Sequence, residues 1–184
     1  FALTGSGAIT VMNCIADSNG ADGFNVASVS VATLSQCDSY DNAGDGLDLS
    51  GSTALAQFTI ESCNFLNNGL FGITSGNAVR NGTISNCGFG SGTQTNASGN
   101  LASNFGGLYE TGSVLYAADV TPWNAPTTGD FKVTLQAAKN TGAGRFTQVQ
   151  ASYTGSTGYP DIGAVQSTNA AAAAAVTTSY TFAQ

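Results

Sequence analysis

Short segments in which apolar and polar residues alternate recur along the first half of the chain. An apolar residue at every second position is typical of a strand with one buried face, and the clearest examples are Ile9-Thr10-Val11-Met12, Val31-Ala32-Thr33-Leu34 and Phe58-Thr59-Ile60. Each segment is followed by a polar turn built around Asn-Gly or Asn-Ala-Gly, then by a second short apolar stretch and a glycine-rich turn. The pattern argues against helices and predicts two short strands per unit.

Four cysteines mark the units of an internal repeat, spaced 23, 26 and 24 residues apart: Cys14, Cys37, Cys63 and Cys87. A polar residue precedes each of them, namely Asn13, Gln36, Ser62 and Asn86. A glycine stands nine residues after each of the first three cysteines and is followed by an apolar residue, in the pairs Gly23-Phe24, Gly46-Leu47 and Gly72-Ile73. Strands this short pair with the equivalent strands of the next unit. The repeat therefore predicts a parallel β-solenoid with coils about 4.8 Å apart.

Two sets of segments resemble a known family. The first set is Asn19-Gly20-Ala21-Asp22-Gly23-Phe24, Asn42-Ala43-Gly44-Asp45-Gly46-Leu47 and Asn68-Gly69-Leu70-Phe71-Gly72-Ile73. These are similar to coils of right-handed parallel β-helix proteins of the pectate-lyase-like superfamily. The second set is Gly129 to Val133, Ala137 to Gly142 and Tyr159 to Gln166, whose closing phrase Pro160, Asp161, Ile162 and Gly163 resembles the end of many such domains. The resemblance implies an all-β, right-handed parallel β-helix of about four to five coils.

Three regions are expected along the chain. Residues 1–107 form the coils, residues 108–166 a closing coil and a β cap over the open end of the stack, and residues 167–184 a C-terminal assembly tail. The tail has six alanines followed by a strand-like alternation, and we expect it to pair with another subunit. Since the chain opens at Phe1, we expect its numbering to begin at a processing site or inside a longer parent protein.

The amino-acid composition excludes several kinds of chemistry and of partner. The chain has no histidine, and 4 Lys+Arg stand against 11 Asp+Glu, for a net charge of −7. Histidine acid–base and zinc chemistry are thereby excluded within this chain, and nucleic-acid binding is not expected because a phosphate-neutralising surface needs cations. No apolar run approaches the roughly 18 residues of a membrane span. The 42% of hydrophobic residues, with 10 Phe and 6 Tyr, predict a folded core.

The cysteine column has three interpretations. We favour an inward structural ladder, because cysteine is among the most often buried residues. Disulfides between neighbouring coils are a second interpretation, since a Cα separation of about 4.8 Å lies inside the disulfide range. A catalytic thiol is the third and least favoured. A four-thiolate zinc site is not expected, because a column along the stack is a line and zinc needs a tetrahedron.

The carboxylates offer a second candidate site. Asp22 and Asp45 occupy equivalent positions in consecutive coils, and Asp38, Asp41 and Asp48 lie on the same coil as Asp45. Stacked like charges raise one pKa or recruit a cation, so Ca²⁺ is one interpretation. We favour the other, in which Asp and Asn are turn residues that tolerate a tight backbone. No other cofactor is expected.

An enzymatic role is not expected. The resemblance implies calcium-binding aspartates with an arginine or lysine base in the lyases, and clustered aspartates in the hydrolases. Of the four cations here only Arg80 lies among the predicted coils, and the sequence has no Asp-Asp pair. We therefore assign no catalytic residue, although coils upstream of Phe1 would leave room for a site.

The preferred functional hypothesis is a structural protein of a virion or of an extracellular or cell-surface assembly. A head fibre, capsid decoration or tail-associated subunit of a phage would suit a rigid, low-charge solenoid with protein neighbours in a homo-oligomer or lattice. The alternative is a secreted carbohydrate-binding or polysaccharide-degrading β-helix, and an adhesin segment is a third hypothesis. Surface glycans would stack on aromatic residues, for which the candidates are Tyr40, Phe65, Tyr109, Tyr116 and Trp123. We assign most of these five to the core or the cap.

Overall fold

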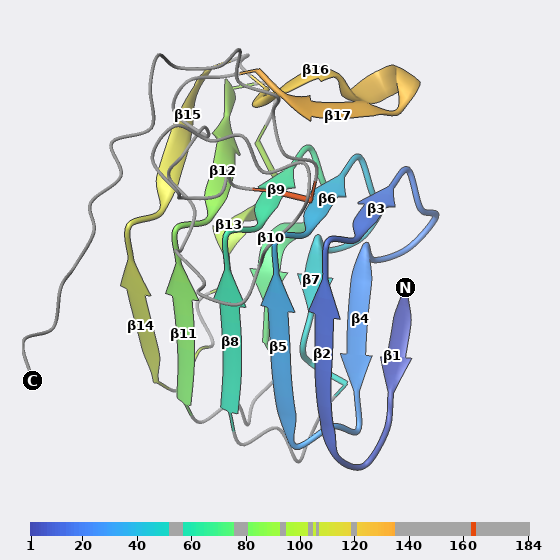
Figure 1. Cartoon of the computed structure of the whole chain (residues 1–184), viewed down its shortest axis with the longest axis vertical. Helices are drawn as coiled ribbons and strands as arrows, with labels where there is room; N and C mark the ends of the chain where they lie inside the picture. The colour runs from blue at the N-terminus through green and yellow to red at the C-terminus, as the bar shows by residue number, and fades with distance from the viewer. Residues whose placement is uncertain are drawn as a thin grey trace, which may run out of the picture.

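A computed structural model describes residues 1–51, 57–75, 81–92, 95–102, 105, 107–118, 121–134 and 163–164. The described residues form strands β1 to β17 and one short 3-10 helix, η2 (Pro126–Thr128), with no α-helix among them (Figure 1). Within these ranges no helix has the length and hydrophobicity that crossing a membrane requires.

Five coils, each with three strands, make up most of the molecule. In chain order the coils are β1 (Ala2–Thr4), β2 (Ala8–Met12) and β3 (Ile15–Asp17); β4 (Phe24–Ala27), β5 (Val31–Ser35) and β6 (Asp38–Tyr40); β7 (Leu47–Asp48), β8 (Gln57–Glu61) and β9 (Asn64–Leu66); β10 (Phe71–Thr74), β11 (Asn81–Ser85) and β12 (Gly88–Ser91); and β13 (Gly99–Leu101), β14 (Leu108–Thr111) and β15 (Val114–Ala118).

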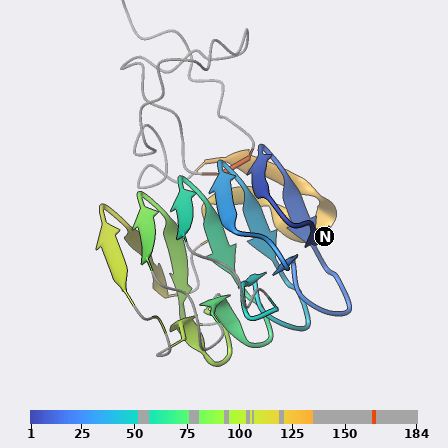
Figure 2. The ribbon, with the colours of Figure 1, turned by 90° about the horizontal axis from the view of Figure 1, so that it is seen from below.

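Equivalent strands of successive coils pair in parallel and build three sheets, and Figure 2 shows the coils side by side. Sheet A has the order β1-β4-β7-β10-β13, sheet B the order β2-β5-β8-β11-β14 and sheet C the order β3-β6-β9-β12-β15. In sheet B the register runs without a break from Val11 through Leu34, Ile60 and Ile84 to Glu110. The predicted parallel β-helix is confirmed, with five coils.

Each coil has one strand more than the alternating pattern predicted. The polar residue before each cysteine has a positive φ of 50–54°, which turns the chain sharply so that a new strand starts in sheet C. A second corner with positive φ follows at Ser18, Asp41 and Asn67. The strands between these corners have three or four residues in the first four coils, too few for alternation to appear in the sequence.

The core fills the space between the three sheets with in-register apolar side chains. Phe58 on β8 shows how the columns adapt: its ring lies where a side chain at Gly82, the paired residue on β11, would be. The Phe58 ring of the third coil thus occupies the space that the missing side chain of Gly82 leaves in the fourth coil. Each fully buried Phe, Leu or Ile contributes about 1.5–3 kcal/mol; the wholly inaccessible ones include Phe24, Leu34, Leu47, Phe58, Ile60, Phe65, Ile73 and Ile84.

The described part of the predicted cap lies on the side of the stack and not over its end. Strands β16 (Trp123–Ala125) and β17 (Asp130–Val133) form an antiparallel hairpin around η2. Trp123 and Phe131 pack edge-on against Tyr40, with ring centroids 5.5 and 6.0 Å away. This second apolar cluster covers the outer face of sheet C, because Tyr40 and Leu66 project outward there.

Part of the expected C-terminal organisation lies outside the described residues. The fifth coil continues through Ala118, beyond residue 107. Of the closing phrase only Gly163 is described, whereas Pro160, Asp161 and Ile162 and the tail 167–184 are not.

Gly82→Ala should lower the free energy of unfolding by about 1–3 kcal/mol, because a Cβ there would collide with the buried Phe58 ring. Adding Phe58→Leu should recover part of this loss, since leucine lacks the ring atoms that collide. Urea unfolding followed by circular dichroism of the two single variants and the double variant measures the coupling. Additive effects would contradict the packing described here.

Candidate functional site

A column of asparagines runs through the turn between sheets C and A. Asn19 Nδ2 donates to Asn42 Oδ1 at 2.7 Å, Asn42 Nδ2 to Asn68 Oδ1 at 2.9 Å, and Asn68 Nδ2 to Asn96 Oδ1 at 2.9 Å. The same oxygens also accept backbone N–H groups from the preceding coil. Asn42, Asn68 and Asn96 are buried, so these amides hold adjacent coils together.

The repeat glycines are required by this column. A Cβ on Gly46 would lie within 3 Å of Asn68 Nδ2, the Phe65 ring and the backbone oxygen of Gly72. Gly23 and Gly72 face equivalent obstructions from the next coil. None of the three has a positive φ, so close approach rather than backbone freedom explains them.

The four cysteines stand in consecutive coils at the corner between sheets B and C. All four are free thiols; Cys37, Cys63 and Cys87 are buried and Cys14 is partly exposed. The Cys63 thiol donates to Glu61 O at 3.3 Å and accepts the backbone N–H of Cys37 at 3.4 Å. Burial raises the pKa of Cys63 well above its usual range, and it also raises that of Cys14. A nucleophilic thiol needs a lowered pKa together with access to solvent. The hydrogen bond with Cys63 lowers the pKa of Cys37, but that thiol is buried, so this geometry favours the structural ladder.

Asp22 and Asp45 bind the backbone of the neighbouring coil. Asp22 Oδ1 accepts the N–H of Asp45 at 2.9 Å, and Asp45 Oδ1 accepts the N–H of Phe71 at 2.8 Å. The Asn25 amide bridges Asp22 and Asp48, at 2.9 and 3.1 Å. Burial raises the pKa of Asp45, with a further contribution from the charges of Asp22 and Asp48.

These contacts are those expected of turn residues. Among the described residues no group of three or more His, Cys, Asp or Glu side chains is arranged to hold a metal ion. Calcium binding at Asp22 and Asp45 stays a prediction.

One of the candidate carboxyl groups, that of Asp38, lies buried on sheet C, which the sequence pattern does not predict. Asp38 projects from β6 beneath the hairpin and is completely inaccessible to solvent. Its Oδ1 accepts from Asn64 Nδ2 and its Oδ2 from the backbone N–H of Ala164, both at 2.8 Å. Burial raises the pKa of Asp38 to about 7, although these hydrogen bonds act in the opposite direction. The sequence places Asp38 with the turn carboxylates, because a three-residue strand does not show which side chains face outward.

The network around Asp38 extends to the fifth coil. The Tyr116 hydroxyl on β15 donates to Asn64 Oδ1, and burial raises its pKa well above the usual range. Gly88 leaves the space for this contact, since a Cβ there would collide with both Tyr116 and Asn64. The indole N–H of Trp123 helps to lower the Asp38 pKa but makes no hydrogen bond of ordinary geometry. Because Asp38 is wholly enclosed, a substrate does not reach it in this structure.

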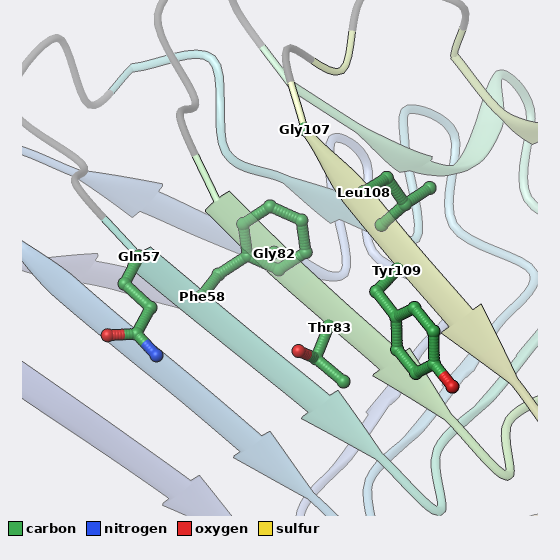
Figure 3. Close-up of a pocket in the computed structure, with 7 residues that line it drawn as sticks. All are labelled: Gln57, Phe58, Gly82, Thr83, Gly107, Leu108 and Tyr109. Atoms are coloured by element: carbon green, nitrogen blue, oxygen red, sulfur yellow. The ribbon is translucent and has the colours of Figure 1, made fainter.

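The five aromatic candidates for sugar stacking divide into four buried residues and one exposed residue. Tyr40, Phe65, Tyr116 and Trp123 are buried, whereas Tyr109 is 66% exposed. Tyr109 and Thr83 lie side by side on β14 and β11, as Figure 3 shows. They border a hollow of about 380 Å³ that is also lined by Gln57, Phe58, Gly82, Gly107 and Leu108.

Sheet B presents an in-register column of threonines on its outer face. The register pairs Thr10, Thr33, Thr59 and Thr83 in successive coils, with Tyr109 as the fifth member. Their apolar neighbours along each strand face the core. Two further rows flank the column on this face. The row before the threonines has Ala8, Val31 and Gln57, and the row after them has Met12, Ser35, Glu61 and Ser85. The middle of this face is therefore nearly uncharged.

The basic partner that a lyase would need is not present among the described coil residues. Lys132 is described, and it is exposed on β17; Arg80, Lys139 and Arg145 lie outside the described residues. No catalytic residue is assigned from this geometry.

Three parallel sheets wound into one solenoid, with side chains stacked in columns, define a parallel β-helix protein. A family model for the right-handed β-helix region matches residues 1–106, which is more than half of the chain. The chain belongs to the right-handed β-helix family. Searches of curated proteins and of solved structures found no match.

Replacing Asp22 by asparagine tests the two interpretations of the acidic turn. Asp22→Asn keeps an oxygen for the Asp45 N–H and relieves like-charge repulsion, so the melting temperature should change little and should not depend on Ca²⁺. Melting curves of wild type and variant with Ca²⁺ and with EDTA measure this. A wild-type melting temperature that rises with Ca²⁺, and a variant that loses the rise, would show a calcium site.

Proposed function

We propose that this chain is a structural component of an extracellular assembly, most simply a phage virion in which it serves as a head fibre, capsid decoration or tail-associated subunit. The single observation that carries the proposal is the outer face of sheet B. Its threonine column is in register over four coils and carries no charge. Such a face packs side by side against an identical or similar face without bringing like charges together.

The interior supports the same role. The asparagine column, the thiol ladder and the apolar core join each coil to the next at several points around its circumference. A stack connected in this way resists bending and local opening, which suits a spacer. The low fraction of charged residues, 8%, also fits a protein that meets many neighbours.

The proposed partners are protein neighbours in a homo-oligomer or lattice. Leu115 is 62% exposed and Leu70 is 46% exposed, which adds apolar contact area outside sheet B. Glu110 takes the fifth place in the column of Leu34, Ile60 and Ile84, and a charge at that place disfavours a sixth coil.

Charges placed on the threonine face should prevent association. We expect the wild-type chain to self-associate in sedimentation velocity and the double variant Thr33→Lys/Thr59→Lys to sediment as a monomer with an unchanged circular dichroism spectrum. Thr4→Lys, on sheet A, is the matched control and should associate like the wild type. A wild-type chain that stays monomeric at all concentrations would contradict the proposal.

Carbohydrate binding is the second candidate function, and Tyr109 is the observation that favours it. An exposed phenol beside a hollow, with a threonine hydroxyl and an amide at its edge, provides a stacking surface together with hydrogen-bonding groups. The size of the hollow suits one or two sugar rings rather than a long chain.

A glycan panel tests this second function. If sugars stack on Tyr109, binding should be lost in Tyr109→Ala and kept in Tyr109→Phe, because stacking needs the ring and not the hydroxyl. Thr10→Ala, in the same column but at the far end of sheet B, is the control. Absence of binding across the panel, with and without calcium, would remove both the lectin and the polysaccharide-degrading hypotheses.

A further inference from the structure

Three Asn-Gly dipeptides occur in the sequence, at Asn19-Gly20, Asn68-Gly69 and Asn81-Gly82. In such a dipeptide the backbone nitrogen of the glycine can attack the side-chain carbonyl carbon of the asparagine, because glycine has no Cβ to obstruct the approach. The attack needs a backbone N–H that is free to lose its proton and a side chain that water reaches. The reactivity of each dipeptide in the folded chain therefore depends on its hydrogen bonds and its burial.

Two of the three glycine N–H groups are bonded to a neighbouring coil. The Gly69 N–H donates to the backbone oxygen of Asn42 at 2.7 Å, and the Gly82 N–H donates to that of Gly107 at 2.8 Å. Asn68 is also buried, and its side-chain amide is hydrogen-bonded to the coils on both sides. Attack at either of these dipeptides thus requires local separation of the coils first.

The Gly20 N–H differs from the equivalent groups of the later coils. At the next three turns the N–H that follows the column asparagine donates to the backbone oxygen of the preceding asparagine, in the pairs Ala43 to Asn19, Gly69 to Asn42 and Ala97 to Asn68. The first coil lies at the end of the stack, and within the described residues the Gly20 N–H has no hydrogen-bond acceptor. Asn19 is partly exposed and Gly20 is exposed, so water reaches both.

The side chain of Asn19 is also held less firmly than that of Asn68. Its Nδ2 donates to Asn42 Oδ1 at 2.7 Å, which is its one side-chain hydrogen bond in the described part of the chain. Releasing a single hydrogen bond slows a reaction by about a factor of ten at most. The surroundings of Gly20 are open, since a Cβ there would meet no heavy atom within 4 Å.

We propose that Asn19 is a site of spontaneous deamidation, which cuts the asparagine column at its first member. The Gly20 nitrogen loses its proton to solvent and forms a bond to Asn19 Cγ, while the side-chain nitrogen takes up a proton and leaves as ammonia. The product is a five-membered succinimide ring. Water then adds to one of the two ring carbonyl carbons and opens the ring to aspartate or isoaspartate. The modification is independent of the assembly proposed above.

Both products weaken the attachment of the first coil. A carboxylate in place of the Asn19 amide has no N–H for Asn42 Oδ1, so two oxygens face each other where Nδ2 now donates. In isoaspartate the main chain runs through the former side chain, which displaces the Asn19 oxygen that accepts the Ala43 N–H at 2.9 Å. The turn between the first two coils should therefore open more often.

Peptide mapping by mass spectrometry of the full chain, aged in mildly alkaline buffer, measures conversion at each dipeptide. We expect Asn19 to convert first and Asn68 and Asn81 to convert roughly a hundredfold more slowly, because local opening must precede attack at both. In urea the three sites should convert at similar rates, since unfolding removes the hydrogen bonds that protect two of them. Conversion of Asn19 no faster than that of Asn68 in the folded chain would overturn the proposal.

Gly20→Ala provides a variant that keeps the fold. The added Cβ meets no heavy atom and the φ of Gly20 is not positive, but the methyl group obstructs the attacking nitrogen, so conversion of Asn19 should slow severalfold. Gly5→Ala, which also places a Cβ in open space, is the matched control and should age like the wild type. Equal conversion of Asn19 in Gly20→Ala and wild type would contradict attack by the Gly20 nitrogen.

Hydrogen exchange of the aged chain tests the effect on the first coil. The Ala43 amide, which donates to Asn19 O, should exchange faster in aged wild type than in aged Gly20→Ala. The Gly69 amide, the equivalent donor one coil further on, should exchange equally in both. Equal Ala43 exchange in converted and unconverted chains would show that deamidation leaves the column intact and would overturn that part of the proposal.

Discussion

The backbone hydrogen bonds between successive coils hold equivalent residues about 4.8 Å apart and thereby impose a column on every position of the repeat. Each residue of a column must therefore pack against the equivalent residues of the coils before and after it. Asparagine meets this condition by donating and accepting along the column, as Asn42 and Asn68 do. Phenylalanine meets it only where the next coil leaves room, as Gly82 does for Phe58. The register of the sheets thus decides which residues each site accepts.

The same constraint explains why so many polar groups are buried in a chain of low charge. Asn42, Asn68 and Asn96 lie inside the structure but pair with backbone and with one another, so their burial has little cost. The turn carboxylates Asp22 and Asp45 bind N–H groups of the neighbouring coil in a similar way. Asp38 differs, because its carboxyl group is enclosed by elements that do not belong to the repeat. That difference makes it the least conventional ionisable group among the described residues.

Close connection between coils and an uncharged threonine column on the outer face are the properties that this architecture offers to function. Columns of short side chains on sheet B make an outer surface that extends in register over four coils. The exposed Tyr109 interrupts that surface at the fifth coil and adds a local hollow. The fold itself is shared by proteins of many activities, so the surface and not the solenoid has to distinguish them.

The sequence by itself determined the period, the parallel solenoid, the cysteine column and the repeat glycines, because each of these depends on residues that recur at a constant spacing. It also placed strands at the alternating segments of sheet B. It did not show the strands of sheet C, which are too short to alternate, or the role of the polar residue at the Asn13 and Gln36 corners. Only the tertiary structure decided that the Trp123 hairpin covers the side of the stack and that Ala164 reaches Asp38, because contacts between segments without a periodic relation leave no pattern along the chain.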